Sequence, residues 1–390
     1  MPTGSVRRVL TVALVLCGAA VAGGRRAAAG ELPPAPPSAP DLARVFEEAR
    51  TAALIPGLAW AVVRDDAVFS QGGCGIEAVE GAERVDEATV FVVASLTKAF
   101  TSAAVAILVD EGRLSWDDPV VRHLPGFRLS DPWVTSRITV RDLLSMRSGL
   151  LDADAPRIRA SPSRKAVVDR LAVAPLRGEF RSTNGTSPNH MYLVAGELVA
   201  AVSGRTWDDF VRERIFAPLG MTRTFTTHDA LLRSGRYARP HRMRDGRVES
   251  LPPQNNEIYG GAGAMTSTAS DLAAWMRLQL ARGRLGGRQL ISETSILEMH
   301  RPQAVWGDYW KSLFNPSARF FTYGMGWIVS DPGGELLVEH GGALPGFTAL
   351  VALLPERRTG FVLLANLDSE TAFAPLNALK FELIERLSRE

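Results

Sequence analysis

The feature that most constrains this 390-residue chain is an apolar run from Ala99 to Val109, long enough for a helix and apolar on nearly every face. Such a helix is stable only when protein surrounds it. Asp110-Glu111-Gly112 follow the run and predict the end of the helix. Since 46% of the residues are hydrophobic, the chain can build a core large enough to bury this helix.

A hydroxyl and an amine stand one turn apart at the start of this helix, in the sequence Ser95-Leu96-Thr97-Lys98. Residues three apart share a helix face. Burial disfavours an unpaired ammonium, so we expect the pKa of Lys98 to fall, and a neutral amine can take the proton of a serine hydroxyl. The pattern predicts acyl transfer through a covalent ester on Ser95. The alternative is a lysine that extends to solvent and a serine that caps the helix.

The N-terminus reads as a targeting segment. Two arginines precede an apolar run from Val9 to Ala22, which is short for a bilayer span, and small-residue cleavage patterns end at Ala22 and Ala29. We predict that residues 1–29 are a signal peptide and that the protein is exported to the periplasm or secreted. An uncleaved membrane anchor, stopped by the arginines at 25 and 26, is the alternative.

Charge and composition exclude several partners. Removal of the four arginines in residues 1–29 changes the formal net charge from +2 to −2, so neither nucleic acid nor an anionic membrane is an expected partner. After signal cleavage no stable membrane insertion is expected. Cys74 would then be the only cysteine, which excludes an intrachain disulfide. The six histidines show no metal-ligand spacing, and no metal or cofactor is predicted. The expected partner is a small-molecule or peptide substrate.

The order of predicted elements indicates an α/β fold with two lobes. A proline-rich linker (30–40) precedes one domain (41–390). The clearest patterns are a helix at 41–53, strands at 57–64 and 67–70, helices from 139 and at 189–202 and 270–282, strands at 326–330, 335–340, 348–354 and 359–365, and a helix at 372–386. Segments 41–90 and 320–390 should share an antiparallel sheet flanked by helices, while 91–319 form a mainly helical lobe, with the site between them.

Four further blocks accompany Ser95-x-x-Lys98 along the chain: Ile55-Pro56-Gly57, Gly112 to Pro119 (GRLSWDDP), Leu143 to Leu150 (LLSMRSGL) and Phe216 to Met221 (FAPLGM). With them the chain resembles the serine beta-lactamase and penicillin-binding-protein superfamily, in particular its class C-like branch of esterases, DD-peptidases and related hydrolases. The resemblance covers roughly residues 42–387. It implies the same two-lobed fold and an acyl-enzyme on the serine.

A third motif of such enzymes matches His340-Gly341-Gly342, which the resemblance places on a strand lining the cleft. It implies that the backbone amides of Ser95 and Ala343 form an oxyanion hole. Penicillin-recognising relatives carry lysine where this chain has His340. A histidine is mostly neutral at pH 7, so a substrate carboxylate is held less firmly. The alternative for His340 is a packed residue at a strand end.

The second motif of these enzymes, Tyr-x-Asn, is incomplete in this chain. Class C-like relatives place Tyr-x-Asn before a helix, and the tyrosine relays protons; here Asn189 takes the asparagine position and Ser187 the tyrosine position. Three replacements for the phenol stay open: Ser187 itself, the upstream Ser182-x-Asn184, or Tyr192. The alternative without catalysis is that residues 182–189 form a polar surface loop and that Tyr192 is a packed helix residue.

These patterns predict an exported serine hydrolase with Ser95 as nucleophile, Lys98 as base and Asn189 positioning an ester or a small D-amino-acid amide or peptide. A catalytically impaired binder or sensor, and a true beta-lactamase, are the competing hypotheses. The run from Gly260 to Gly263 predicts a tight turn at the cleft, because no lysine follows it as in a phosphate-binding loop. The absence of Gly-x-Ser-x-Gly argues against an alpha/beta-hydrolase.

Overall fold

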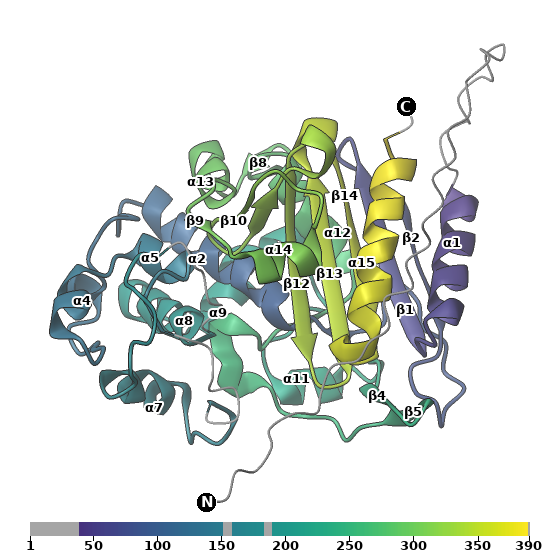
Figure 1. Ribbon diagram of the computed structural model, residues 1–390, viewed down its shortest axis with the longest axis horizontal. Coiled ribbons are helices and arrows are strands. Elements are labelled where there is room, and N and C mark those ends of the chain that lie inside the picture. The colour runs from purple at the N-terminus through teal and green to yellow at the C-terminus, as the bar shows by residue number, and fades with distance from the viewer. Residues whose placement is uncertain (1–38, 151–157, 183–188, 389–390) are drawn as a thin grey trace, which may run out of the picture.

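An eight-stranded antiparallel sheet forms the centre of one lobe (Figure 1). The computed structural model describes residues 39–150, 158–182 and 189–388. The strand order is β2-β1-β14-β13-β12-β11-β10-β9, and the strands are β1 (Gly57–Arg64), β2 (Ala67–Gly75), β9 (Ala304–Val305), β10 (Phe321–Tyr323), β11 (Ile328–Ser330), β12 (Leu337–Leu344), β13 (Phe347–Leu354) and β14 (Thr359–Ala365). Because β1 pairs with β14, both ends of the domain meet in one sheet, and the predicted fold class is confirmed.

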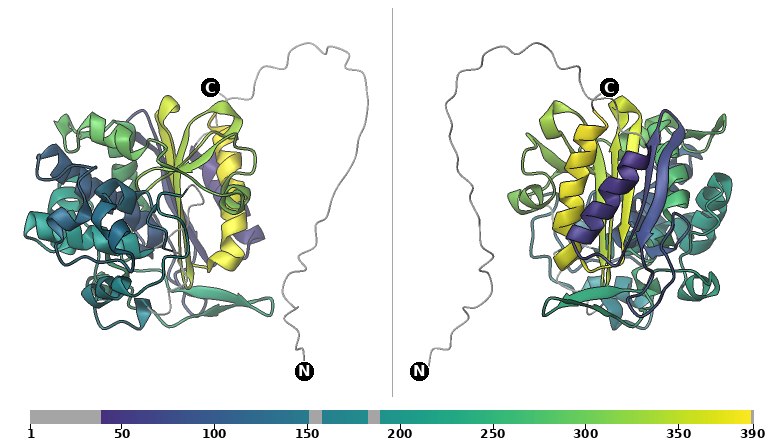
Figure 2. Two further views of the ribbon diagram at one scale, coloured as in Figure 1. Left: turned by 60° about the vertical axis from the view of Figure 1, so that its left-hand side comes forward. Right: turned by 90° about the vertical axis from the view of Figure 1, so that its right-hand side faces the viewer.

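Two terminal helices, α1 (Ala39–Ala52) and α15 (Ser369–Arg386), lie side by side over one face of the sheet (Figure 2). Beneath them Phe46 stacks on Trp60, with ring centroids 4.5 Å apart. The helix α12 (Ala269–Leu280) packs against β1 and β14 from the opposite face. Both α12 and β9 lie in the segment 91–319, which was expected to form the helical lobe. The helix α12 instead covers the second face of the sheet, which must also be buried, and β9 is the edge strand next to β10.

The second lobe is mainly helical and is arranged around α2 (Thr97–Asp110). Every residue of α2 from Thr97 to Leu108 is buried, as its apolar pattern predicts, and Phe100 stacks on Trp275 of α12 at 3.9 Å. The other helices are η1 (Ala94–Leu96), α3 (Val120–His123), α4 (Pro132–Arg137), α5 (Val140–Leu144), α7 (Arg164–Asp169), η2 (Arg170–Ala172), α8 (Asn189–Ser203), α9 (Trp207–Val211), η3 (Arg212–Phe216), α10 (Ala217–Leu219), α11 (His228–Arg233), η4 (Glu257–Ala262), α13 (Glu293–Met299), α14 (Asp308–Phe314), η5 (Pro332–Gly334) and η6 (Pro355–Arg357). Short strand pairs are β3 (Phe91–Val92) with β6 (Thr266–Ser267), β4 (His241–Arg244) with β5 (Arg247–Ser250), and β7 (Arg284–Leu285) with β8 (Arg288–Gln289).

Most predicted elements are present, but β9 and β10 of the main sheet and the pair β4–β5 were not predicted, and two predicted strands end later than expected. The strands predicted at 57–64 and 359–365 match β1 and β14. The strands predicted to end at 70 and 340 continue to Gly75 and Leu344, because backbone pairing with neighbouring strands overrides the low strand propensity of glycine.

The predicted signal peptide and nearly all of the predicted linker lie outside the described residues. Within the described part of the chain, no helix has the length and apolar character needed to cross a bilayer.

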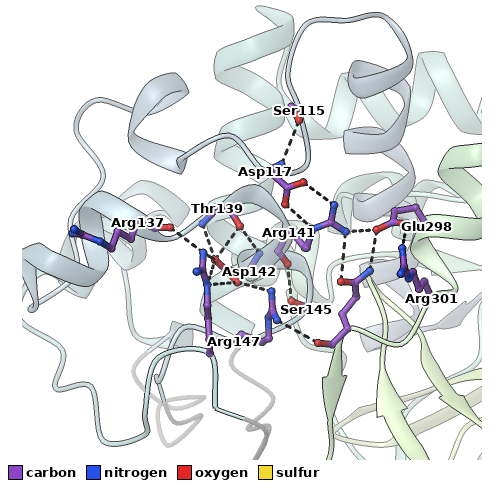
Figure 3. Close-up of polar contacts among 12 residues, drawn as sticks. Ser115, Asp117, Arg137, Thr139, Arg141, Asp142, Ser145, Arg147, Glu298 and Arg301 are labelled. Atoms are coloured by element: carbon purple, nitrogen blue, oxygen red, sulfur yellow. Dashed lines mark hydrogen bonds and ion pairs between the residues drawn. The ribbon is translucent and has the colours of Figure 1, made fainter.

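A buried carboxylate fixes the start of α5 to the chain that leads toward α8 (Figure 3). Asp142 is fully buried and accepts hydrogen bonds from Arg147 at 2.7 Å, Arg181 at 2.8 Å and the backbone N–H of Thr139 at 3.0 Å. Arg147 also donates to the carbonyl of Gln303, just before β9. Since a buried carboxylate is stable only when paired, this cluster ties the helical lobe to the sheet edge.

Candidate functional site

Ser95 lies in a strained turn at the head of α2. The preceding residue, Ala94, has a φ of +48°, a left-handed conformation that residues other than glycine rarely adopt. Thr97 stabilises the turn by donating its hydroxyl to the Ala94 carbonyl at 2.6 Å. Ala94 and Leu96 are buried, whereas Ser95 is partly exposed. The turn therefore leaves Ser95 partly accessible between two buried neighbours, and strain of this kind is typical of functional sites.

Lys98 is buried, 1% exposed, and its amine is surrounded by hydrogen-bond partners from three segments. Nζ lies 2.7 Å from Ser95 Oγ, 2.8 Å from Asn189 Oδ1 and 2.9 Å from the carbonyl oxygen of Ala262. A neutral amine donates to Asn189 and Ala262 and accepts from the Ser95 hydroxyl, whereas an ammonium donates to all three. The amine can thus gain a proton without losing these partners. A lysine that extends to solvent is excluded by this burial.

The Ala262 carbonyl was missed by the sequence analysis. It belongs to η4, where the predicted tight turn is found. Gly261 packs directly on α2: its carbonyl accepts from Thr101 at 2.7 Å, and a Cβ at this position would lie 2.8 Å from the same hydroxyl oxygen. The glycine is needed for this close approach, which directs the next carbonyl at Lys98.

The residues of the second predicted motif are only partly described. Asn189 is the first residue of α8 and contacts Lys98, while Ser187 and Asn184 lie outside the described residues. Tyr192 is fully buried and donates its hydroxyl to the Leu144 carbonyl at 2.6 Å. Burial raises the pKa of Tyr192. Its hydroxyl is engaged with the helical core, so Tyr192 is a packed helix residue in this structure, and the third replacement for the phenol is not supported.

His340 on β12 is buried and neutral. Its Nδ1–H donates to the carbonyl of Gly341 at 2.6 Å, and its Nε2 accepts from the hydroxyl of Tyr323 at 3.0 Å. Burial, and secondarily the nearby Lys98, lowers the pKa of His340 to about 3. The side chain therefore carries no charge at neutral pH, as its residue type suggests. Tyr323, which lies on β10, had no signal in the sequence.

Gly342 brings β12 against the turn that carries Ser95. A Cβ at Gly342 would lie 2.3 Å from the Val93 carbonyl oxygen and 3.2 Å from the Ser95 amide nitrogen. Only glycine fits this approach. The next residue, Ala343, is exposed. The pairing of the Ser95 and Ala343 amides as an oxyanion hole stays a prediction, and the contact at Gly342 supports it.

A cavity of about 530 Å³ borders Ala343 and continues under the turn between β12 and β13. Its charged and aromatic lining residues are Arg159, Arg242, Tyr259, Asp368 and Glu370. Space for a substrate group therefore adjoins the candidate oxyanion position, with charges of both signs on its walls. The described residues contain no cluster of His, Cys, Asp and Glu that is arranged to hold a metal ion.

Comparisons with known proteins find relatives along most of this chain. The sequence aligns with an unguisins hydrolase of Aspergillus campestris at 28% identity, covering 89% of this chain and 65% of that protein. Protein flp of Staphylococcus aureus is 27% identical, over 81% of this chain and 60% of its own length. The chain thus spans less than two thirds of the length of these curated relatives.

Solved structures show the same fold. A class C beta-lactamase from Rhodobacter sphaeroides superposes with a TM-score of 0.69 at 21% identity, covering 88% of this chain and 99% of that one. A D-stereospecific amidohydrolase from a Streptomyces species gives a TM-score of 0.66 at 23% identity, covering 83% and 94%. The Beta-lactamase family model matches residues 42–383, nearly the whole described chain, so this protein belongs to the beta-lactamase family of serine beta-lactamases and penicillin-binding proteins.

Proposed function

We propose that this protein is an exported serine hydrolase that forms an acyl-enzyme on Ser95 and acts on esters or small D-amino-acid amides. The observation that carries the proposal is the 2.7 Å contact between the Ser95 hydroxyl and the buried Lys98 amine. A buried amine beside a serine is the arrangement that generates a nucleophile at neutral pH. The apolar leader and small-residue cleavage patterns support export.

In the proposed acylation step, Ser95 Oγ attacks the substrate carbonyl while its proton passes to Lys98 Nζ. Asn189 and the Ala262 carbonyl hold the resulting ammonium in place. The amides of Ser95 and Ala343 would stabilise the negative oxygen of the tetrahedral intermediate. This intermediate collapses to the serine ester as its bond to the leaving group breaks, and the Lys98 ammonium gives its proton to the leaving alcohol or amine, which restores the neutral amine.

Deacylation completes the cycle. A water molecule loses a proton to the regenerated Lys98 amine and attacks the ester carbonyl. The products are the free acid and Ser95 with its hydroxyl restored, so each turnover consumes one water molecule. The base must be neutral at the start of both steps, and its burial favours that form.

The uncharged side chain of His340 supports esters and small amides as the proposed substrates. A neutral imidazole, in place of the lysine of penicillin-recognising relatives, gives a substrate carboxylate no countercharge at that position. The cavity beside Ala343 offers space for an acyl or leaving group. Esters and small amides therefore fit this site better than penicillins.

Covalent labelling tests the proposal. We expect a fluorophosphonate probe to label the purified full-length protein at Ser95 alone, and Ser95→Ala to abolish the label while its thermal unfolding midpoint stays unchanged. Ser102→Ala is the matched control, because Ser102 lies on α2 shortly after Ser95 but is fully buried. Peptide mapping that finds the adduct on another residue would overturn the assignment of the nucleophile.

Three outcomes separate the competing functions. Labelling accompanied by turnover of a short-chain p-nitrophenyl ester supports the hydrolase. Labelling without turnover, or with accumulation of a stable adduct, indicates a binder or sensor that acylates once. Hydrolysis of a penicillin faster than of the ester would instead show a beta-lactamase.

A substitution at Gly342 tests the contact between β12 and the Ser95 turn. We expect Gly342→Ala to lower ester hydrolysis at least tenfold and stability by roughly 1–3 kcal/mol, because the added Cβ displaces the strand. Gly126→Ala is the control, since a Cβ there meets nothing within 4 Å. Kinetics and thermal unfolding of both variants measure the effect, and a fully active Gly342→Ala enzyme would refute the close approach.

A further inference from the structure

The hydrogen bonds of His340 define its tautomer. A backbone carbonyl can only accept, so the 2.6 Å contact with Gly341 O requires a proton on Nδ1. In the neutral ring, Nε2 is then an acceptor, and the Tyr323 hydroxyl at 3.0 Å is its donor. Of the two neutral tautomers, only the Nδ1–H form fits both contacts.

The Tyr323 side chain is itself held rigidly. It is fully buried and stacks on Trp306, with ring centroids 4.5 Å apart and an interplanar angle of 15°. Burial raises the pKa of Tyr323 well above its ordinary value, so the phenol keeps its proton and remains a donor. The groups that face His340 are thus this phenol from β10 and the Lys98 amine from α2, with Tyr192 of α8 close to the phenol.

We propose that Tyr323 is a positioning residue of the acyl-transfer site, because its phenol fixes His340 as the neutral Nδ1–H tautomer, which in turn holds the Gly341 carbonyl of β12. The Gly341–Gly342 peptide packs on the Ser95 turn, where a Cβ on Gly342 would approach the Ser95 amide to 3.2 Å. Fixing this carbonyl therefore fixes the segment that ends at the candidate oxyanion residue Ala343.

The neutral state of His340 also makes it easier for Lys98 to accept a proton. Lys98 becomes positively charged each time it accepts the Ser95 proton, and a second positive charge on nearby His340 would oppose that step. Because the phenol donates to Nε2, it disfavours protonation of that nitrogen. Through one hydrogen bond, Tyr323 thus both holds the β12 segment in place and keeps His340 uncharged.

The kinetic consequence rests on the proposed function, whereas the tautomer does not. We expect Tyr323→Phe to lower kcat for an activated ester roughly tenfold, the effect of one lost hydrogen bond, with little change in KM. We also expect activity to fall at acidic pH where the natural protein is still active, because His340 gains a proton more readily. Tyr309→Phe removes a hydroxyl from a tyrosine that is 71% exposed and should change neither property.

Nitrogen NMR of the imidazole rings is the decisive measurement and needs no activity. In the Ser95→Ala protein, His340 should show a protonated Nδ1 and an unprotonated Nε2 across the neutral pH range, and Tyr323→Phe should shift the Nε2 signal and raise the pKa of His340. An Nε2–H tautomer in the parent protein, or an Nε2 signal that Tyr323→Phe leaves unchanged, would overturn the proposal. If the tautomer is as expected but Ser95 forms no adduct, only the proposed function fails.

Discussion

Lys98→Arg should hydrolyse esters roughly 10² to 10⁴ times more slowly than the natural protein, which is the usual contribution of a positioned general base. The guanidinium retains the positive charge but does not give up its proton, so it cannot accept the proton of Ser95. It is also planar and longer than the amine that now fits between Ser95, Asn189 and Ala262. Steady-state kinetics with a p-nitrophenyl ester measure the loss.

Lys165→Arg provides the control, because its side chain is 76% exposed and pairs with Asp169 on the surface of α7. The natural enzyme should become faster with rising pH as the base loses its proton. Since burial favours the neutral amine, this rise should occur below the pH at which an exposed lysine titrates. If Lys98→Arg keeps most of its rate, Lys98 is not the base.

The enzyme should accelerate the hydrolysis of an activated ester more than that of an amide with the same acyl group. An amide nitrogen must be protonated before it leaves, and a positioned acid contributes roughly 10² to 10⁴ to that step. The resemblance to class C-like enzymes puts Ser187 at the tyrosine position of the second motif. The Tyr192 hydroxyl is bound to the Leu144 carbonyl, and the Tyr323 hydroxyl is bound to His340. We therefore expect the rate enhancement for an ester to exceed that for the amide by a factor of this size.

Rates for a p-nitrophenyl ester and the matching p-nitroanilide, each divided by its uncatalysed rate, measure this difference. Ser187→Tyr should narrow it if the chain places the ring beside Ser95. Tyr192→Phe should leave it unchanged. Equal enhancements in the natural protein, or loss of amide hydrolysis in Tyr192→Phe alone, would show that a phenol does serve the leaving group.

Local patterns in the sequence were sufficient to predict the central helix and the reactive pair of Ser95 and Lys98. The apolar run after Lys98 predicted a buried helix, and α2 is buried from Thr97 to Leu108. The spacing of Ser95 and Lys98 placed both on one helix face, where their side chains meet at 2.7 Å. These features depend on residues within one or two turns of each other, so helix geometry alone determines them.

The rest of the site depended on which distant segments pack together. Lys98 meets Asn189 and Ala262 across 91 and 164 positions of the chain, and Tyr323 reaches His340 from another strand of the sheet. The partners of such buried polar groups are fixed by the tertiary arrangement and not by any local periodicity.

The sequence by itself thus determined the central helix, the joining of both ends of the domain in one antiparallel sheet, and the candidate nucleophile with its base. Only the tertiary structure decided how the base is held, which tautomer His340 adopts, that Tyr192 is a packed residue, and that α12 covers the second face of the sheet. The physical reason is that the apolar pattern of a helix or strand repeats among residues that are close in the chain, whereas a buried hydrogen bond between distant segments forms only after the core has brought them together.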